Sequence, residues 1–235
     1  MNKKNKAVYY LILSLLSIFL LSLLILYDSN RNNITDNSDR YLISLLLIIC
    51  FIIGLLRTLH PKSYKKVLKY FNKESIKTKT QNSNRRKIGH HPDCEKFQKH
   101  RIFVKNKVYC TGCLGLAIGC VISILLIISY LILYVNLNYP IHYYLFFLGV
   151  VIVILTFLEI LLPFKQKHFH MFINAFFVIS FLLITLSILE ITNNIIYAMI
   201  SILISFLWLE TRITLSSYNH SAICSRCSET CKMFN

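Results

Sequence analysis

Residues 108–134 read VYCTGCLGLAIGCVISILLIISYLILY and contain no Asp, Glu, Lys or Arg. The hydrocarbon core of a bilayer is about 30 Å thick, and an α-helix needs roughly 20 apolar residues to cross it. Because this stretch is longer than one crossing requires, we expect a transmembrane helix that either tilts or begins in the cytoplasmic headgroup region.

Five further stretches have the same apolar character: residues 8–27, 41–59, 143–163, 171–191 and 195–213. Of the 235 residues, 55% belong to the hydrophobic set, and the mean hydropathy of +0.56 exceeds that of ordinary soluble domains. The sequence therefore predicts an all-α fold, a polytopic transmembrane helical bundle of about six spans. Lysines precede the first stretch as in a signal peptide, but its apolar part is long and no A-x-A site follows, so we interpret it as an uncleaved anchor.

The basic residues predict how the spans are oriented. If the N-terminus is placed in the cytoplasm, 24 of the 26 Lys and Arg residues fall on the cytoplasmic side, as the positive-inside rule requires. We therefore expect a multi-pass protein of the cell membrane with both termini in the cytoplasm. The chain then divides into a first transmembrane hairpin (1–59), a basic cytoplasmic segment (60–107), a four-helix transmembrane region (108–214) and a cytoplasmic tail (215–235).

The basic cytoplasmic segment begins with an amphipathic pattern. Within residues 62–73, apolar side chains recur at i, i+3, i+4 and i+7 among five lysines, which predicts a helix lying in the membrane interface. Each lysine near the surface contributes about 1 kcal/mol of attraction to anionic lipid. The expected partner of residues 62–73 is therefore the bilayer with its anionic headgroups, and a solvated juxtamembrane helix is the alternative. No nucleic-acid-binding motif accompanies the charge of +16, so nucleic acid is not an expected partner.

Six of the eight cysteines gather with histidines in two clusters, whereas Cys50 and Cys120 lie inside apolar stretches and are interpreted as packing residues. In the first cluster, Cys110 and Cys113 have the spacing that lets two thiols turn toward one ion, as in structural zinc sites. The candidate metal ligands of the two clusters are His90, His91, Cys94, His100, Cys110, Cys113, His220, Cys224, Cys227 and Cys231.

These candidates are enough for two tetrahedral sites. One partition takes His91, Cys94, Cys110 and Cys113 for the first ion and His220, Cys224, Cys227 and Cys231 for the second. An interleaved arrangement is the alternative. In a reducing cytoplasm, thiolates beside imidazoles favour zinc over disulfides. The expected cofactor is therefore zinc, although the spacing leaves an iron-sulfur cluster open.

The first cluster also resembles a known family. Residues 90–119 contain His-His-Pro-Asp-Cys, then Phe97, then Cys-Thr-Gly-Cys-Leu-Gly-Leu running into a helix. This arrangement resembles domain-of-unknown-function family 2085, an uncharacterised family of small prokaryotic membrane proteins, although the family pattern opens with Cys-His where this chain has His90-His91. The resemblance implies a multi-span membrane protein with a Cys/His motif and no established reaction.

Ionisable residues within the predicted spans are costly and need partners or water. Glu190 lies close to the outer end of its span, where we expect it to be solvated. Glu159, Glu210 and Arg212 lie near inner ends, at the depth of the proposed metal. We expect these three to pair with one another or to reach the interface. The alternative is a carboxylate that supports the metal, acts as a general base or forms part of an ion path.

Two further residue pairs lie at predicted inner ends of the spans. His168 and His170 are on a short inner loop, where we expect them in the headgroup region, with membership of the metal site as the alternative. Gly115 and Gly119 form a small-xxx-small face, which allows close helix packing beneath the thiols.

Three functional hypotheses follow from these patterns. The leading one is a binding or scaffold protein whose cytoplasmic helix ends are tied by one or two structural zinc ions. The second is a membrane metalloenzyme or thiol redox protein, which needs an open coordination position or a thiol pair that cycles. An ion transporter is the weakest, because the predicted spans lack ionisable residues near mid-depth. No nucleotide loop, paired-carboxylate motif or nucleophile elbow identifies an enzyme.

Overall fold

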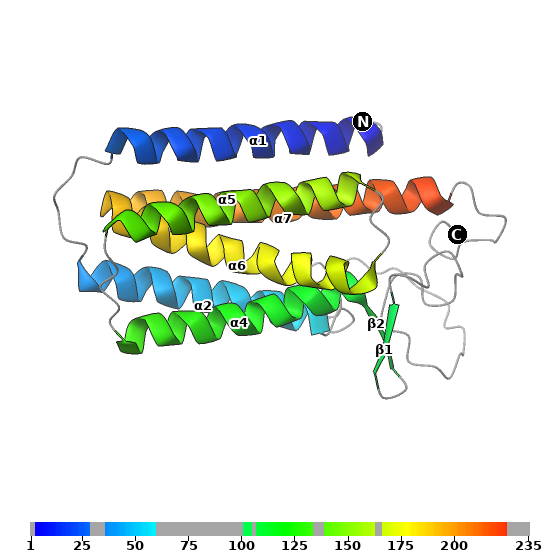
Figure 1. The fold of residues 1–235 in the computed structure, drawn as a ribbon, viewed down its shortest axis with the longest axis horizontal. Coiled ribbons are helices and arrows are strands. Elements are labelled where there is room, and N and C mark those ends of the chain that lie inside the picture. Colours follow the sequence, from blue (N-terminus) through cyan, green and yellow to red (C-terminus); the bar gives the residue numbers. More distant parts are fainter. Residues whose placement is uncertain are drawn as a thin grey trace, which may run out of the picture.

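The computed structural model describes residues 3–28, 36–59, 101–104, 107–133, 139–162 and 166–224. Within these ranges the chain forms six long helices and one β-hairpin (Figure 1). The elements in chain order are α1 (Lys3–Asp28), α2 (Asn37–Leu59), β1 (Arg101–Val104), β2 (Lys107–Cys110), α4 (Thr111–Leu133), α5 (Tyr139–Leu161), α6 (Lys167–Thr192) and α7 (Ile195–Cys224). All six helices are long and apolar enough to cross a membrane. The predicted bundle of six helices, each of a length and composition suited to crossing a membrane, is therefore confirmed.

The hairpin is the main difference from the predicted fold. The apolar pattern starts the third span at residue 108, but residues 107–110 form strand β2, and α4 begins only at Thr111. The strands pair antiparallel, with Ile102 opposite Tyr109 and Phe103 opposite Val108. Because β-branched and aromatic residues favour strands, the apolar residues at 108–110 serve the hairpin rather than the membrane helix.

Helix α7 is longer than its apolar pattern predicts. The predicted span ends at residue 213, whereas the helix continues to Cys224. Leu215 is buried in the apolar core that α7 forms with α1, α5 and α6, and Tyr218 packs against the same core. Nδ2 of Asn219 donates a hydrogen bond to the backbone carbonyl of Ile160 on α5. These contacts extend the helix beyond the apolar span, so the first part of the predicted tail is helical.

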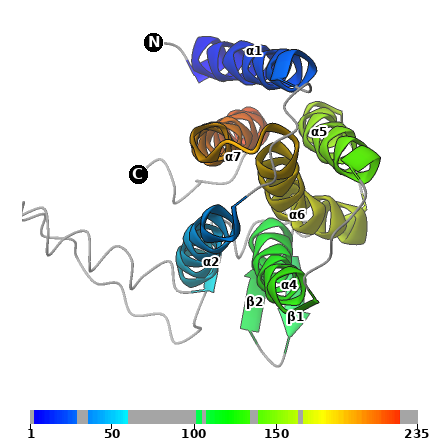
Figure 2. The same ribbon diagram turned by 90° about the vertical axis from the view of Figure 1, so that its left-hand side faces the viewer.

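Helix α6 lies at the centre of the bundle, with α1, α4, α5 and α7 around it and α2 packed against α4 (Figure 2). In the most apolar stretch of α6, 67% of the residues are buried, a larger share than in any other candidate span of the described chain. The surrounding helices expose large apolar side chains to the outside, among them Leu125, Ile132 and Leu203. Such an exposed apolar surface is suited to lipid rather than to water.

Two glycines allow α4 to approach α6 closely. A Cβ on Gly115 would meet the backbone carbonyl of Met171, and a Cβ on Gly119 would meet that of Ala175. Small residues four positions apart let two helix backbones come together. The predicted packing face at Gly115 and Gly119 is confirmed, and it places the first turns of α4 against the first turns of α6.

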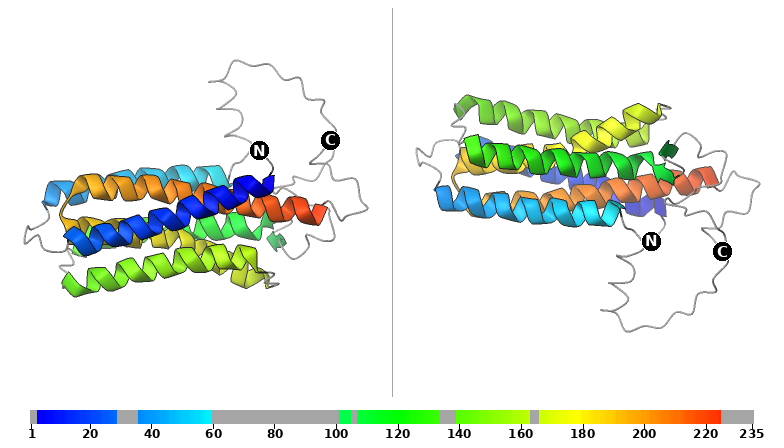
Figure 3. Two further views of the ribbon diagram at one scale, coloured as in Figure 1. Left: turned by 90° about the horizontal axis from the view of Figure 1, so that it is seen from above. Right: turned by 90° about the horizontal axis from the view of Figure 1, so that it is seen from below.

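Successive helices run in opposite directions, which brings many chain segments to one end of the bundle (Figure 3). This end holds the start of α1, the end of α2, the hairpin, the start of α4, the end of α5, the start of α6 and the end of α7. We call it the thiol end, because Cys110 and Cys113 lie there. The distribution of Lys and Arg predicts that all these segments lie on the same side of the membrane. The structure agrees, because it places them at the same end of the bundle.

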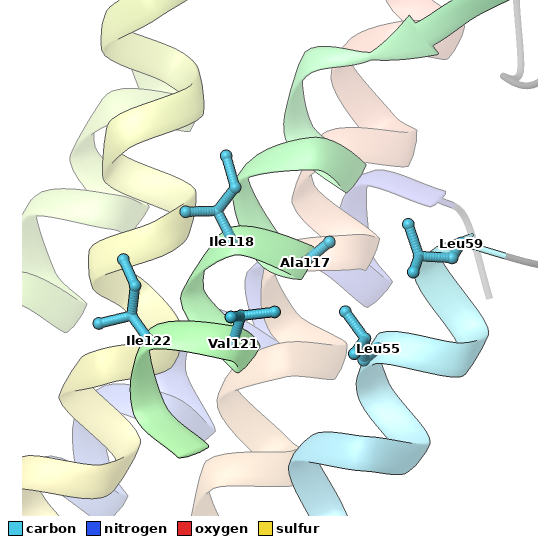
Figure 4. A pocket seen from close by; sticks show the side chains of 6 residues that line it. All are labelled: Leu55, Leu59, Ala117, Ile118, Val121 and Ile122. Carbon is cyan, nitrogen blue, oxygen red and sulfur yellow. The ribbon is translucent and has the colours of Figure 1, made fainter. Parts of the chain in front are cut away.

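A shallow apolar pocket lies between α2 and α4 (Figure 4). Its lining residues are Leu55 and Leu59 from α2 and Ala117, Ile118, Val121 and Ile122 from α4. Because none of these side chains carries a polar group, the pocket supplies no chemistry and is not a candidate site.

Candidate functional site

The Cys110–Cys113 pair lies where the hairpin meets helix α4. Cys110 is the last residue of β2 and pairs with Arg101 of β1, and Cys113 lies in the first turn of α4. Both are free cysteines of intermediate burial. The sulfur of Cys110 accepts hydrogen bonds from the thiol of Cys113 and from the backbone N–H groups of Gly112 and Cys113. It therefore satisfies N–H groups at the start of the helix, which have no partner within the helix itself.

These hydrogen bonds make the Cys110 thiol more acidic. The Cys113 thiol contributes most, and together with the two backbone N–H groups and the nearby His170 it lowers the pKa of Cys110 to about 5, although partial burial acts in the opposite direction. These contacts therefore favour the thiolate form of Cys110. The thiolate is the form that binds metals and attacks disulfides.

Helices α5 and α6 bring a histidine and a carboxylate together beside the thiols. Nδ1 of His170 donates a hydrogen bond to Oε1 of Glu159 at 2.7 Å, and the two side chains are 19% and 7% exposed. The His170 ring lies against the backbone between the two cysteines, because its Nε2 is 3.2 Å from the position of a Cβ on Gly112. His170 therefore lies in the first turn of α6 and packs against the neighbouring helices, whereas His168 is exposed.

A buried arginine lies next to this pair. Arg212 of α7 is 6% exposed, its guanidinium carbon is 6.0 Å from the centre of the Phe177 ring, and its Nη2 is 3.6 Å from the position of a Cβ on Gly112. Its charge interacts with Glu159 and with both thiols. Arg212 and Glu159 therefore attract each other without forming a direct ion pair, whereas Glu210 is exposed on α7.

Some polar atoms around the thiols are buried without a hydrogen-bond partner in the part of the chain that the structure describes. They are Oε2 of Glu159, Oδ1 of Asn174 and Nε of Arg212. Leaving a buried polar group unpaired costs about 1–3 kcal/mol, and native proteins rarely do so without a reason. We call the residues of this region the thiol-end cluster: Cys110, Cys113, Glu159, His170, Asn174 and Arg212.

Only some of the predicted metal ligands lie within the described residues. The structure brings Cys110 and Cys113 together and places His220 and Cys224 in the final turns of α7. His90, His91, Cys94, His100, Cys227 and Cys231 lie outside the described residues, as does the amphipathic helix predicted for residues 62–73. Within the described ranges, no group of three Cys, His, Asp or Glu side chains is placed to hold one metal ion. The zinc sites therefore stay predictions.

The two cysteines outside the clusters pack against apolar neighbours. Cys120 is 4% exposed in a core cluster built from α2, α4, α6 and α7, and Cys50 packs against the same cluster. The sulfur of Cys120 is 3.3 Å from the position of a Cβ on Gly54. Their interpretation as packing residues is confirmed.

A partly buried ion pair lies at the end of the bundle opposite the thiols. Nη2 of Arg40 on α2 donates to Oε2 of Glu190 on α6 at 2.7 Å, and the hydroxyl of Tyr130 on α4 donates to Oε1 of the same carboxylate. The Glu190 side chain is 8% exposed, so the expectation of a solvated carboxylate is wrong. The carboxylate instead connects three helices.

The contact between His170 and Glu159 is the feature that sequence reasoning missed. A signal for it existed, because Glu159 lies in the last turn of α5 and His170 in the first turn of α6. Two antiparallel helices joined by a short connection place such positions at the same depth. The sequence patterns followed only the cysteine clusters, and neither residue belongs to them.

No family model, no curated protein and no solved structure matches this chain. The resemblance of residues 90–119 to family 2085 therefore stays an expectation that rests on the motif.

Proposed function

We propose that this chain is a membrane-embedded binding or scaffold protein whose thiol end is held together by structural zinc. The observation that carries the proposal is the Cys110–Cys113 pair at the start of a membrane-spanning helix. The two thiols are hydrogen-bonded to each other, and backbone N–H groups donate to the sulfur of Cys110. A turn of this kind supplies two of the four ligands of a structural zinc site.

The charges around the thiols support a divalent cation at this position. Two thiolates balance the charge of one Zn²⁺ ion, and Arg212 balances Glu159, with which it interacts. A balanced group matters here because an uncompensated charge in a buried site is strongly destabilising. The remaining zinc ligands would come from the other candidate cysteines and histidines.

We further propose that the thiol end faces the cytoplasm and that the protein is a multi-pass protein of the cell membrane. The distribution of Lys and Arg supports this orientation. Residues 62–73 would then bind anionic headgroups, which brings the metal region close to the membrane surface. The resemblance to family 2085 is consistent with a multi-span protein that carries a Cys/His motif.

Elemental analysis of the purified full chain tests the zinc proposal. We expect zinc in the parent protein and a clear loss of zinc when Cys110 and Cys113 are both replaced by Ser. Cys50→Ser is the matched control, because Cys50 packs inside the bundle away from the thiols, and it should keep the parent zinc content. A parent chain without metal, or an unchanged zinc content in the double variant, would contradict the proposal.

A specific observation also favours thiol–disulfide exchange as a second candidate function. The acidic Cys110 thiol has the Cys113 thiol within hydrogen-bonding distance at the start of a helix, which is the arrangement of a nucleophilic and a resolving cysteine. The Cys110 thiolate would attack a substrate disulfide, and Cys113 would then displace the mixed disulfide. The substrate is reduced to a dithiol while Cys110 and Cys113 become a disulfide. Purified protein that contains no metal and forms this disulfide reversibly in a glutathione buffer would favour this activity over zinc.

A further inference from the structure

We propose that the charge of Arg212 raises the reduction potential of the Cys110–Cys113 pair by stabilising its reduced form. This inference rests on thiol–disulfide exchange, the second candidate function, and it gives a role to a residue of α7 that belongs to neither cysteine cluster of the sequence. Arg212 acts through the two thiols, so it is a positioning residue rather than a catalytic one.

Arg212 is a buried cation beside the turn that joins the two thiols. It is 6% exposed, and its Nη2 lies 3.6 Å from the position of a Cβ on Gly112, the residue that precedes Cys113. Its guanidinium carbon lies over the ring of Phe177, 6.0 Å from the ring centre. An aromatic face attracts a cation, but it carries no net charge that could balance the guanidinium.

Other side chains of α7 fix the position of this segment. The hydroxyl of Thr211 shares a hydrogen bond of 2.6 Å with that of Ser14 on α1. One turn earlier, the fully buried Trp208 donates from Nε1 to the hydroxyl of Ser17 at 2.9 Å. These contacts anchor α7 to α1 without using the arginine, so a substitution of Arg212 leaves them in place.

The negative charge near Arg212 comes from Glu159 and from the thiols. Oε1 of Glu159 accepts the hydrogen bond from His170. Within the described residues, neither Oε2 of Glu159 nor Nε of Arg212 has a hydrogen-bond partner. Glu159 therefore attracts the guanidinium without pairing with it directly, and the guanidinium also attracts a thiolate at the start of α4. Such an attraction is stronger at a buried site than in water.

The exchange step changes the charge that faces Arg212. The Cys110 thiolate bonds to one sulfur of a substrate disulfide and releases the other as a thiolate. The sulfur of Cys113 then loses its proton, bonds to Cys110 and releases the second substrate sulfur. Two electrons have passed to the substrate, one released thiolate takes the proton of Cys113, and the other takes a proton from the solvent.

The disulfide formed between Cys110 and Cys113 is neutral, whereas the reduced pair carries the thiolate. The positive charge of Arg212 therefore stabilises the reduced form alone. A thiol pair whose reduced form is stabilised has a higher reduction potential and is a stronger oxidant. This links a buried residue of α7 to the direction in which the pair exchanges with a substrate.

Equilibration of the purified full chain with glutathione tests this inference. The chain is kept in detergent micelles with metal removed by a chelator, and mass spectrometry after thiol trapping gives the fraction of disulfide at each glutathione ratio. Arg212→Gln should raise the equilibrium constant for disulfide formation about tenfold, which corresponds to a reduction potential about 30 mV lower. Arg212→Met should shift it in the same direction, and its apolar side chain suits a buried position.

Two further variants separate charge from shape. Arg212→Lys keeps the positive charge, so it should change the reduction potential less than either neutral variant does. Arg57→Gln is the matched control, because it makes the same substitution at an exposed arginine in the last turn of α2, at the thiol end. Water and salt screen an exposed charge, so this variant should keep the parent potential.

The possible failures are distinguishable. A parent chain that forms no reversible Cys110–Cys113 disulfide overturns the exchange candidate and this inference together. A parent chain that forms it, with both neutral variants at the parent potential, overturns the role of Arg212 alone. An equal shift in Arg212→Lys and in the neutral variants would show that the shape of the arginine matters rather than its charge. Loss of the folded protein in both neutral variants would show a packing role, and either result would also overturn the inference.

Discussion

Nδ1 of His170 donates a hydrogen bond to Oε1 of Glu159 at 2.7 Å, which joins the start of α6 to the end of α5 beside the Cys110–Cys113 pair. In the sequence the cysteine clusters look like isolated loop motifs. In the structure the pair of thiols starts a transmembrane helix and is backed by side chains from three other helices. A site supported by helices is held more accurately than a site on loops alone.

Gly112→Ala should weaken metal binding without unfolding the bundle. The new methyl group would lie 3.2 Å from Nε2 of His170, so the turn between the two thiols and its neighbours would have to shift by a few tenths of an ångström. Zinc affinity should fall about tenfold or more, as for a disturbed supporting contact, in a competition assay with a chelator. Gly54→Ala is the control, because its methyl group would lie 3.3 Å from the sulfur of Cys120, within the apolar core. Equal zinc affinities of the two variants would contradict the prediction.

Gly119→Val should destabilise the bundle, because the side chain has no room between α4 and α6. A Cβ on Gly119 would already lie 2.9 Å from the Cβ of Val178. Overpacking of this kind costs about 1–3 kcal/mol, measurable as a lower free energy of unfolding in detergent micelles. The same change at Ser129, which is exposed on α4, should have little effect. A Gly119 variant as stable as the parent would show that the two helices can separate at no cost.

Glu190→Gln should destabilise the end of the bundle opposite the thiols while leaving the zinc content unchanged. The substitution removes the negative charge that faces Arg40 in this ion pair. Removing one partner of a fully buried ion pair costs about 3–5 kcal/mol, and we expect a smaller loss because this pair is only partly buried, with Arg40 17% exposed. Thermal unfolding together with elemental analysis measures both effects. Glu210→Gln, at an exposed position, should alter neither, and loss of zinc from Glu190→Gln would contradict the separation of the two ends.

The six spans could be predicted because the bilayer imposes a single strong requirement, an apolar run long enough to cross it. The ends of the helices could not be predicted in the same way. At residues 108–110 the apolar side chains satisfy a strand equally well, and only the pairing with β1 shows which structure they adopt. Beyond residue 213, α7 continues because Tyr218 and Asn219 contact other helices, and local sequence carries no signal for such contacts.

The same distinction applies to the candidate site. The Cys110–Cys113 pair was predictable, because its spacing is local and chemically specific. The partners of Glu190 and His170 were not, because each lies on another helix, and burial depends on how the helices pack. Because Glu190 lies close to the outer end of its span, the sequence predicted a solvated carboxylate. In the structure Arg40 and Tyr130 instead contact this carboxylate. Depth along a span therefore predicts less about an ionisable group than the neighbours that packing supplies.

The lowered pKa of Cys110 predicts an unusual pH dependence of its alkylation. With metal removed by a chelator, its reaction with iodoacetamide should stay nearly constant from about pH 8 to about pH 6 and should decline as the pH approaches about 5. An ordinary thiol with a pKa of about 8.5 already slows at neutral pH. Because the folded state favours the thiolate, its contribution to stability is present above the ordinary pKa and is lost as the pH falls through about 5.

The Cys113→Ala variant provides the control for this prediction. It removes the thiol that contributes most to the acidity of Cys110, so the midpoint of the alkylation profile should move upward, toward that of an ordinary thiol. Mass spectrometry of the peptide that contains Cys110, after short reactions at a series of pH values, gives the profile directly. If the parent protein had the midpoint of an ordinary thiol, or if Cys113→Ala left a low midpoint unchanged, the hydrogen bond between the two thiols would not be what makes Cys110 acidic. The thiol-exchange candidate would then lose its main support, whereas the zinc proposal would still be tested by its own metal analysis.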